Sequence, residues 1–388
     1  MPAKFFKLIL LAALACFTWP AFAQSVIAPN MVSLRDTVIK NQLISSLNGF
    51  LSEKDSPNKD NKYVLKEDLL ETSALLDEMK GMEQSSRYND KTFYKCHLTN
   101  VVKLEGENYI IQFSYIGIGE GTPLLRASFR LIARNMNGQF YFSSPLKQNT
   151  QYWKSRRLAN ITFHYKDTLN RKDAELYFKT VSYYDRKLKA PASSVEFYYC
   201  DNFSEAQQLL GIDYKSDYNG IKTDILSSHE NNVSMILDGG SSYSHRFDPH
   251  DLWHERLRTV MNADIINRPV DEGCAYLYGG SWGFTWREVL FKFKQYANDH
   301  PDADWLSLYT ETKNFADGDK SMKIAYALNA LIAQKIEKEK GFAAVMELLG
   351  CGKRETGDDN YFKALEKQTG ITKVNFNTAM WELVKVAK

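Results

Sequence analysis

The stretch Asp248-Pro-His250-Asp-Leu-Trp-His254-Glu-Arg-Leu-Arg258 places two histidines four residues apart. Asp248 is suited to cap the N-terminus of a helix, and Pro249 is suited to its first turn. Residues four apart lie on one face of a helix, so both imidazoles can reach one metal ion. The chain contains only seven histidines, and three of them, His245, His250 and His254, fall within ten residues. This clustering predicts a metal site. His245 is expected to be a loop histidine that does not bind the metal.

A second stretch, Arg268-Pro-Val-Asp271-Glu272-Gly273-Cys-Ala275-Tyr276, offers Glu272 as a third ligand. Zinc in hydrolytic sites takes three histidine or carboxylate ligands and keeps a fourth position for water. Glu272 lies eighteen positions after His254 (272 − 254). This interval leaves room to finish one helix, turn, and begin a second helix that lies against the first. The expected ligands of a Zn²⁺ ion are therefore His250, His254 and Glu272.

Together the two stretches resemble the gluzincins, zinc metallopeptidases in which His-Glu-x-x-His is followed by a third ligand in a Glu-Gly-x-Ala context. The resemblance covers roughly residues 158–388 and implies a zinc-dependent hydrolase with a small mixed sheet and a mainly helical C-terminal lobe. It also implies a peptide or protein substrate that pairs with an edge strand, expected at Val233–Leu237. A tyrosine hydroxyl stabilises the oxyanion in related enzymes, and Tyr326, Tyr276 and Tyr278 are candidates, although each can equally be a packed core aromatic.

The sequence departs from the family pattern directly after the first histidine, where Asp251 replaces the glutamate that serves as general base. Its carboxylate is one methylene shorter, and a base must lie about 2.6–3.2 Å from the proton that it removes. A displacement on the order of 1 Å can cost about a hundredfold in rate. Glu255 is expected to point away from the ligand face. Two interpretations stay open: a hydrolase weakened at Asp251, or a catalytically inactive, peptidase-like binding or scaffold protein of the cell envelope.

The first 23 residues have the features of a secretory signal peptide. Basic residues precede a short apolar run, Leu8–Phe17, and Ala21-Phe-Ala23 matches a cleavage site. We therefore expect export to the periplasm or the cell exterior. Lipidation at Cys16 is less favoured, because the preceding Ala13-Leu-Ala15 begins with alanine where such a site usually begins with leucine. No later run approaches the roughly 20 apolar residues of a membrane helix, so no transmembrane segment is expected.

Residues 24–157 are predicted to form an α+β module of helices followed by an antiparallel sheet. Apolar residues recur at helical spacing in 32–50 and 65–79, and aromatic and β-branched residues then dominate 92–104, 109–116, 125–132 and 139–144. The order of elements resembles the nuclear-transport-factor (NTF2-like) or cystatin-like folds. Such a module could bind a small ligand of its own or pack as a prodomain.

Residues 158–388 are predicted to begin with a strand, a helix and a strand, at 161–165, 172–188 and 195–199. The segment 213–230 reads as a loop. Beyond Asp248 helices dominate, with a capping box at Thr285-Trp-Arg-Glu288 and helices that end at Gly341, Gly350 and Gly370. One of these is expected to start at about Lys320. The predicted fold class of the whole chain is therefore α+β.

The composition excludes strong charge-driven partners. With 49 basic and 47 acidic residues the formal charge is +2, which provides no field to attract nucleic acid. After removal of a signal peptide, Cys96, Cys200, Cys274 and Cys351 remain. An even number of cysteines in an exported protein permits disulfides, but buried free thiols are equally expected in a chain of this size.

Overall fold

The computed structural model describes residues 25–28, 32, 34, 36–191, 193–216, 225–240, 247–318 and 320–388. The predicted signal peptide, Cys16 and His245 lie outside these residues. The chain divides into two compact units, one comprising Met1–Trp153 and Phe203–Leu237 and the other Lys154–Asn202 and Asp238–Lys388. Within the described ranges, no helix combines the length and the apolar character needed to cross a membrane.

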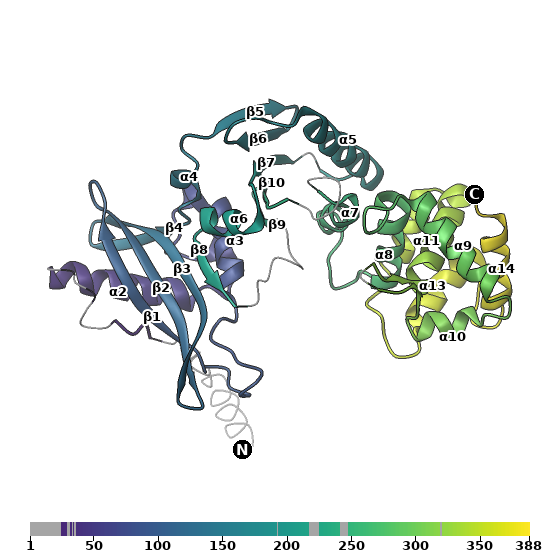
Figure 1. Cartoon of the computed structure of the whole chain (residues 1–388), viewed down its shortest axis with the longest axis horizontal. Coiled ribbons are helices and arrows are strands. Elements are labelled where there is room, and N and C mark those ends of the chain that lie inside the picture. The colour runs from purple at the N-terminus through teal and green to yellow at the C-terminus, as the bar shows by residue number, and fades with distance from the viewer. Residues whose placement is uncertain are drawn as a thin grey trace, which may run out of the picture. The chain divides into compact units, whose positions relative to one another are not determined.

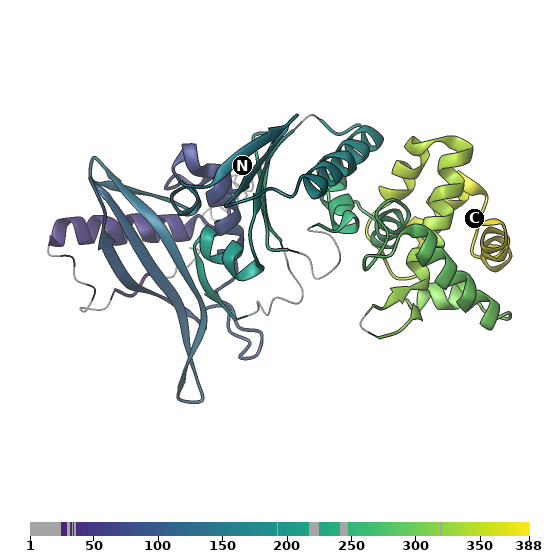
Figure 2. The same ribbon diagram turned by 45° about the horizontal axis from the view of Figure 1, so that its top comes forward.

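The first unit contains an antiparallel sheet in the order β1 (Lys95–Lys103), β2 (Asn108–Gly119), β3 (Thr122–Met136) and β4 (Gln139–Ser143), with β8 (Ile212–Lys215) also paired to β3. Alternate residues of β3 are buried, among them Phe129 and Leu131. Asn137 and Gly138 adopt positive φ angles of 54° and 88° in the tight turn between β3 and β4. Figure 2 shows the long β2–β3 hairpin extending beyond the neighbouring elements. The predicted α+β character and antiparallel sheet are confirmed.

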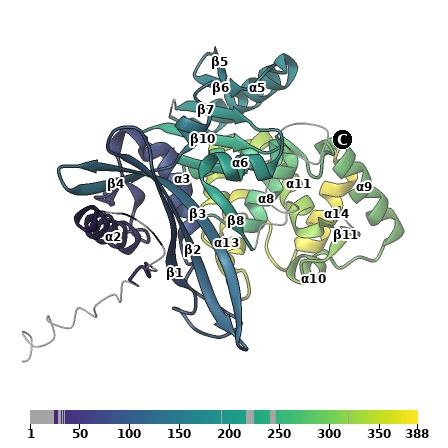
Figure 3. The same cartoon turned by 60° about the vertical axis from the view of Figure 1, so that its left-hand side comes forward.

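Two helices, α2 (Thr37–Ser52) and α3 (Leu69–Met79), accompany this sheet. The ring centroids of Phe50 on α2 and Phe142 on β4 lie 5.1 Å apart, and the backbone N–H of Phe140 donates to Ser46 Oγ at 3.0 Å. Figures 1 and 3 show α2 running along one face of the sheet. The unit also contains the short elements η1 (Asn58–Asp60), η2 (Lys66–Asp68), α4 (Leu146–Asn149) and α6 (Phe203–Leu210). The likeness of this unit to NTF2-like or cystatin-like folds stays a prediction.

A second sheet is mixed and has the order β5 (Lys154–Leu158), β6 (Ile161–Tyr165), β7 (Ser194–Tyr199), β10 (Val233–Asp238) and β9 (Ile225–Glu230). Strands β5 and β6 are antiparallel, whereas β6 and β7 are parallel. The helix α5 (Arg171–Leu188) connects β6 to β7. This strand-helix-strand unit agrees with the sequence-based prediction.

Two expectations about this region are wrong. Val233–Leu237 is not an edge strand, because β10 lies between β7 and β9 in the sheet and its residues after Val233 are all buried. The segment Asp213–Glu230 is not a simple loop, because it contains most of β8 and all of β9. Asn231 and Asn232 adopt φ angles of 51° and 61°, which allow a two-residue turn to fold β9 back against β10. A peptide therefore cannot add to the sheet at Val233–Leu237.

Beyond Asp248 the second unit is mainly helical, as predicted (Figure 1). Its helices are α7 (Pro249–Arg258), α8 (Arg268–Gly279), α9 (Trp286–Asp299), α10 (Trp305–Thr310), α11 (Ile324–Lys340), α12 (Phe342–Leu349), α13 (Asp359–Thr369) and α14 (Phe376–Val386). The capping box of Thr285 and Glu288 is present, and α11, α12 and α13 end at Gly341, Gly350 and Gly370. Helix α11 begins later than expected, because β12 (Met322–Lys323) pairs with β11 (Asn314–Ala316).

The four cysteines that follow the predicted signal peptide are all free thiols in the structure. Cys96, Cys200 and Cys274 are buried, and Cys351 is half-buried. The sequence left both disulfides and buried free thiols open, and the structure contains free thiols. Desolvation raises the pKa of the Cys351 thiol to about 11, so this group is protonated at neutral pH.

Candidate metal centre

Three candidate ligand atoms come together between α7 and α8. The Nε2 atoms of His250 and His254 are 3.2 Å apart, and Glu272 Oε2 lies 3.3 Å from the first and 3.9 Å from the second. Three ligands of a tetrahedral zinc ion, each bonded at about 2.0–2.2 Å, are separated by about 3.3–3.6 Å. Imidazole nitrogens and carboxylate oxygens are common metal ligands, and these three groups together could hold a metal ion.

The local sequence explains why α7 presents both histidines on one face. Asp248 caps the helix, with its Oδ1 accepting the backbone N–H of His250 at 2.9 Å, and Pro249 occupies the first turn. Trp253 and Leu257, three and seven residues after His250, are buried along the same side of the helix. Both histidines are consequently held at the edge of the core with their ring nitrogens directed to α8.

Two glycines allow α8 to approach its neighbours closely. A Cβ atom on Gly273 would lie 2.6 Å from Asn329 Cβ on α11, and one on Gly279 would lie 2.6 Å from the backbone nitrogen of His250. Contacts this short force a backbone shift, so both positions favour glycine. The glycine directly after Glu272 thus fixes the depth at which α8 packs on α11.

Each imidazole also has a neighbouring acceptor on the side of its Nδ1 atom, away from the Nε2 atoms. His250 Nδ1 lies 2.8 Å from the carbonyl oxygen of Gly280, and donation to this oxygen leaves Nε2 free as the ligand atom. His254 Nδ1 is 2.9 Å from Asp271 Oδ1, although the two atoms are not aligned as a regular hydrogen bond. Asp271 is only 5% exposed, and its Oδ1 accepts from Trp253 Nε1 at 3.2 Å. In metalloproteins such outer partners orient the ligands, and Asp271 lies where a partner of this kind would stand behind His254.

The carboxylate of Glu272 dominates the electrostatics of the metal-free site. Burial alone would lower the pKa of His250, but the hydrogen bond and the negative charge of Glu272 raise it to about 9. Burial opposes ionisation of Glu272, yet the two histidines and Arg268 keep its pKa below the usual value. The site is therefore built around an ionised carboxylate that attracts a cation.

The residues with predicted catalytic roles lie on different sides of this centre. Asp251 is exposed in the first turn of α7, one residue after His250. Tyr326 on α11 is 9% exposed and lies near Glu272 and Arg268. The Tyr276 ring is 5.7 Å from the rings of both His250 and Tyr326. Tyr326 and Tyr276 thus adjoin the ligands, and Asp251 remains open to solvent.

Two further residues face other parts of the fold. The Tyr278 hydroxyl donates to Glu337 Oε2 at 2.6 Å, and its ring lies 4.8 Å from the Trp253 ring, so this tyrosine belongs to a packed network. Glu255 is half-buried near Asp185 and Arg256. Burial raises the pKa of Glu255 to about 7. Its surroundings differ from those of the ligands, as expected for a side chain directed away from them.

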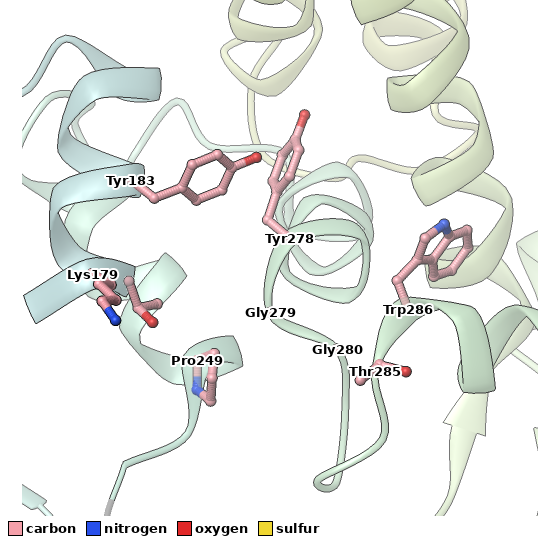
Figure 4. Close-up of a pocket in the computed structure, with 9 residues that line it drawn as sticks. Lys179, Tyr183, Pro249, Tyr278, Gly279, Gly280, Thr285 and Trp286 are labelled. Carbon is pink, nitrogen blue, oxygen red and sulfur yellow. The ribbon is translucent and has the colours of Figure 1, made fainter. Parts of the chain in front are cut away.

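A cavity of about 330 Å³ adjoins the backbone that holds His250. Figure 4 shows the hydroxyl end of Tyr183 pointing toward the Tyr278 ring, whose centroid lies 6.5 Å from that of Tyr183, with Pro249 on one side and Trp286 on the other. The remaining lining residues are Lys179, Thr180, Gly279, Gly280 and Thr285. Pro249 and Gly280 therefore contribute both to the cavity and to the support of His250. The cavity is assembled from α5, α7, α8 and α9, so no single sequence motif could have predicted it.

No protein-family model matches the chain, and no curated protein matches it.

Proposed function

We propose that this protein is an exported zinc-dependent hydrolase similar to the gluzincin metallopeptidases, with zinc held by His250, His254 and Glu272. The observation that carries the proposal is the convergence of these three ligand atoms within 4.8 Å of one another. Partners on the far side of each imidazole support it, because they leave both Nε2 atoms directed to one point. Peptides or proteins are the proposed substrates.

A bound zinc ion supplies a Lewis acid that polarises the scissile carbonyl and lowers the pKa of a water molecule. Asp251 is the proposed proton acceptor, because it follows His250 and its side chain is exposed to solvent. The Tyr326 hydroxyl is the proposed donor to the developing oxyanion, because this residue lies beside Glu272 and retains 9% exposure. Asp271 and the Gly280 carbonyl hold the two histidines in place.

A second candidate function is a catalytically inactive, peptidase-like binding or scaffold protein of the cell envelope, with or without a bound metal ion. Two observations favour it: the shorter carboxylate of Asp251 stands at the position of the base, and the strand at Val233–Leu237 is not a free edge for substrate. In this case the ligands would keep their geometry while proton transfer fails.

Peptide hydrolysis by zinc-loaded Asp251→Glu and Asp251→Ala variants distinguishes the two functions. A weakened hydrolase should gain kcat/KM with glutamate, up to about a hundredfold if the base regains its distance to the water, and should lose activity with alanine. Zinc content is measured on the same samples. Hydrolysis absent from wild type and from Asp251→Glu, with zinc bound in both, would contradict the hydrolase and favour the binding protein.

A further inference from the structure

Two cationic side chains flank Tyr326 beside the metal ligands. Arg268 Nε lies 3.5 Å from Glu272 Oε1, and Tyr326 lies close enough to Arg268 to interact with its charge. Lys323 Nζ lies 5.4 Å from the centroid of the Tyr326 ring. The Arg268 side chain is 78% exposed, so most of its guanidinium is accessible to a ligand. The rim of the metal centre on the Tyr326 side therefore carries two positive charges, and we refer to Arg268 and Lys323 as the cationic rim.

The position of Lys323 is fixed by the fold, whereas its charge is not neutralised. Its backbone N–H donates to the Tyr276 hydroxyl at 3.4 Å, and it immediately precedes α11. Lys323 forms no salt bridge with any residue that the structure describes. By contrast, the nearby Arg354 is paired with Asp358 at 3.0 Å. Lys323 is thus a positioned cation whose missing partner can come from a ligand.

The charge of Arg268 is also only partly balanced. Its acidic partner, Glu272, is one of the three proposed ligands and would share its negative charge with a bound metal ion. A guanidinium can bind a carboxylate through two parallel hydrogen bonds, and an ammonium adds a point charge.

We propose that the cationic rim recognises a carboxylate of the substrate, so that the preferred substrates are peptides with an anionic group next to the scissile bond. This inference rests on the proposed hydrolase, and it adds the class of substrate. The carboxylate can be the C-terminus of the peptide or an acidic side chain, because both present the same planar anion to Arg268 and Lys323.

Three matched dipeptide analogues with a metal-binding thiol test this inference. One carries a free C-terminal carboxylate, one carries an acidic side chain and an amidated C-terminus, and one carries neither anion. Their affinities for the zinc-loaded full-length protein are measured by calorimetry at low and high salt. We expect at least one anionic analogue to bind about tenfold more tightly than the neutral one, with a smaller ratio at high salt. The tighter of the two identifies the source of the carboxylate.

The variants Lys323→Gln and Arg268→Gln should each reduce this ratio, and the double variant should abolish it, whereas the exposed Lys385→Gln on α14 should leave it unchanged. Equal binding of the three analogues to zinc-loaded wild type, or an anion preference that survives in the double variant, would overturn the inference. Zinc content measured on the same samples distinguishes failure of this inference from failure of the proposed zinc hydrolase. Protein that takes up no zinc contradicts the proposed function, and the inference fails with it.

Discussion

Replacement of Asp271 should weaken zinc binding although this residue is not a ligand. Its Oδ1 lies 2.9 Å from His254 Nδ1 and also accepts from Trp253 Nε1 at 3.2 Å. Loss of an outer partner of a metal-bound histidine typically lowers metal affinity by about 10- to 100-fold, or about 1.4–2.7 kcal/mol. We expect Asp271→Asn to lie near the lower end, because its amide oxygen can still accept from Trp253 Nε1 and can stay beside His254 Nδ1. Asp271→Ala should lie near the upper end.

Asp271→Ala should also destabilise the metal-free protein, because the buried Trp253 Nε1 loses its acceptor at a cost of about 1–3 kcal/mol. Competition with a chromophoric zinc chelator measures the affinity, and chemical denaturation of chelator-treated protein measures the free energy of unfolding. The exposed Asp299→Asn on α9 is the matched control. Zinc affinity of Asp271→Ala within about twofold of wild type would refute the argument that Asp271 orients His254.

Two further predictions concern the stability of the second unit. Arg256 is 1% exposed, and its Nε donates to Asp185 Oδ1 at 2.6 Å. Arg256→Ala should therefore lower the free energy of unfolding by about 3–5 kcal/mol, whereas the exposed Arg258→Ala should change it by less than about 0.5 kcal/mol. Equal effects of the two variants in denaturation curves would contradict the role of the buried pair. Glu272 raises the pKa of His250 to about 9 in the metal-free protein, so this interaction stabilises the fold fully below pH 6.5 and is lost as the pH rises through 9. Chelator-treated wild type should therefore lose up to about 3 kcal/mol of its free energy of unfolding between pH 7 and 10, and His250→Gln should lose less. Zinc affinity should rise over the same pH interval, because the metal ion displaces the proton on His250. A zinc affinity that does not change with pH would contradict this assignment.

The ends of several helices could be predicted from the sequence. Asp248 and Pro249 begin α7, Thr285 and Glu288 form the capping box of α9, and Gly341 ends α11. Each of these depends on interactions within one turn of a helix, which neighbouring residues determine. The proximity of His250, His254 and Glu272 could also be predicted, because helical spacing and a short connection between two helices bring the three residues together.

Features that depend on long-range pairing could not be predicted. Val233–Leu237 lies beside β7, whose residues are almost 40 positions earlier in the chain, and no local pattern distinguishes such an interior strand from an edge strand. The contributions of Asp271 and of the Gly280 carbonyl depend on how α8 packs against α7. Asp271 directly precedes the third ligand, and this adjacency is the sequence feature that could have suggested its role.

The metal content of the purified protein tests the central claim most directly. The full chain is prepared without a histidine tag, dialysed against zinc and then buffer, and measured by mass spectrometry beside a His250→Ala, His254→Ala double variant. Circular dichroism confirms that both proteins are folded. The geometry of His250, His254 and Glu272 predicts close to one zinc ion per wild-type chain and none in the double variant. Wild-type protein without zinc, or equal zinc in the two proteins, would contradict the proposed metal centre.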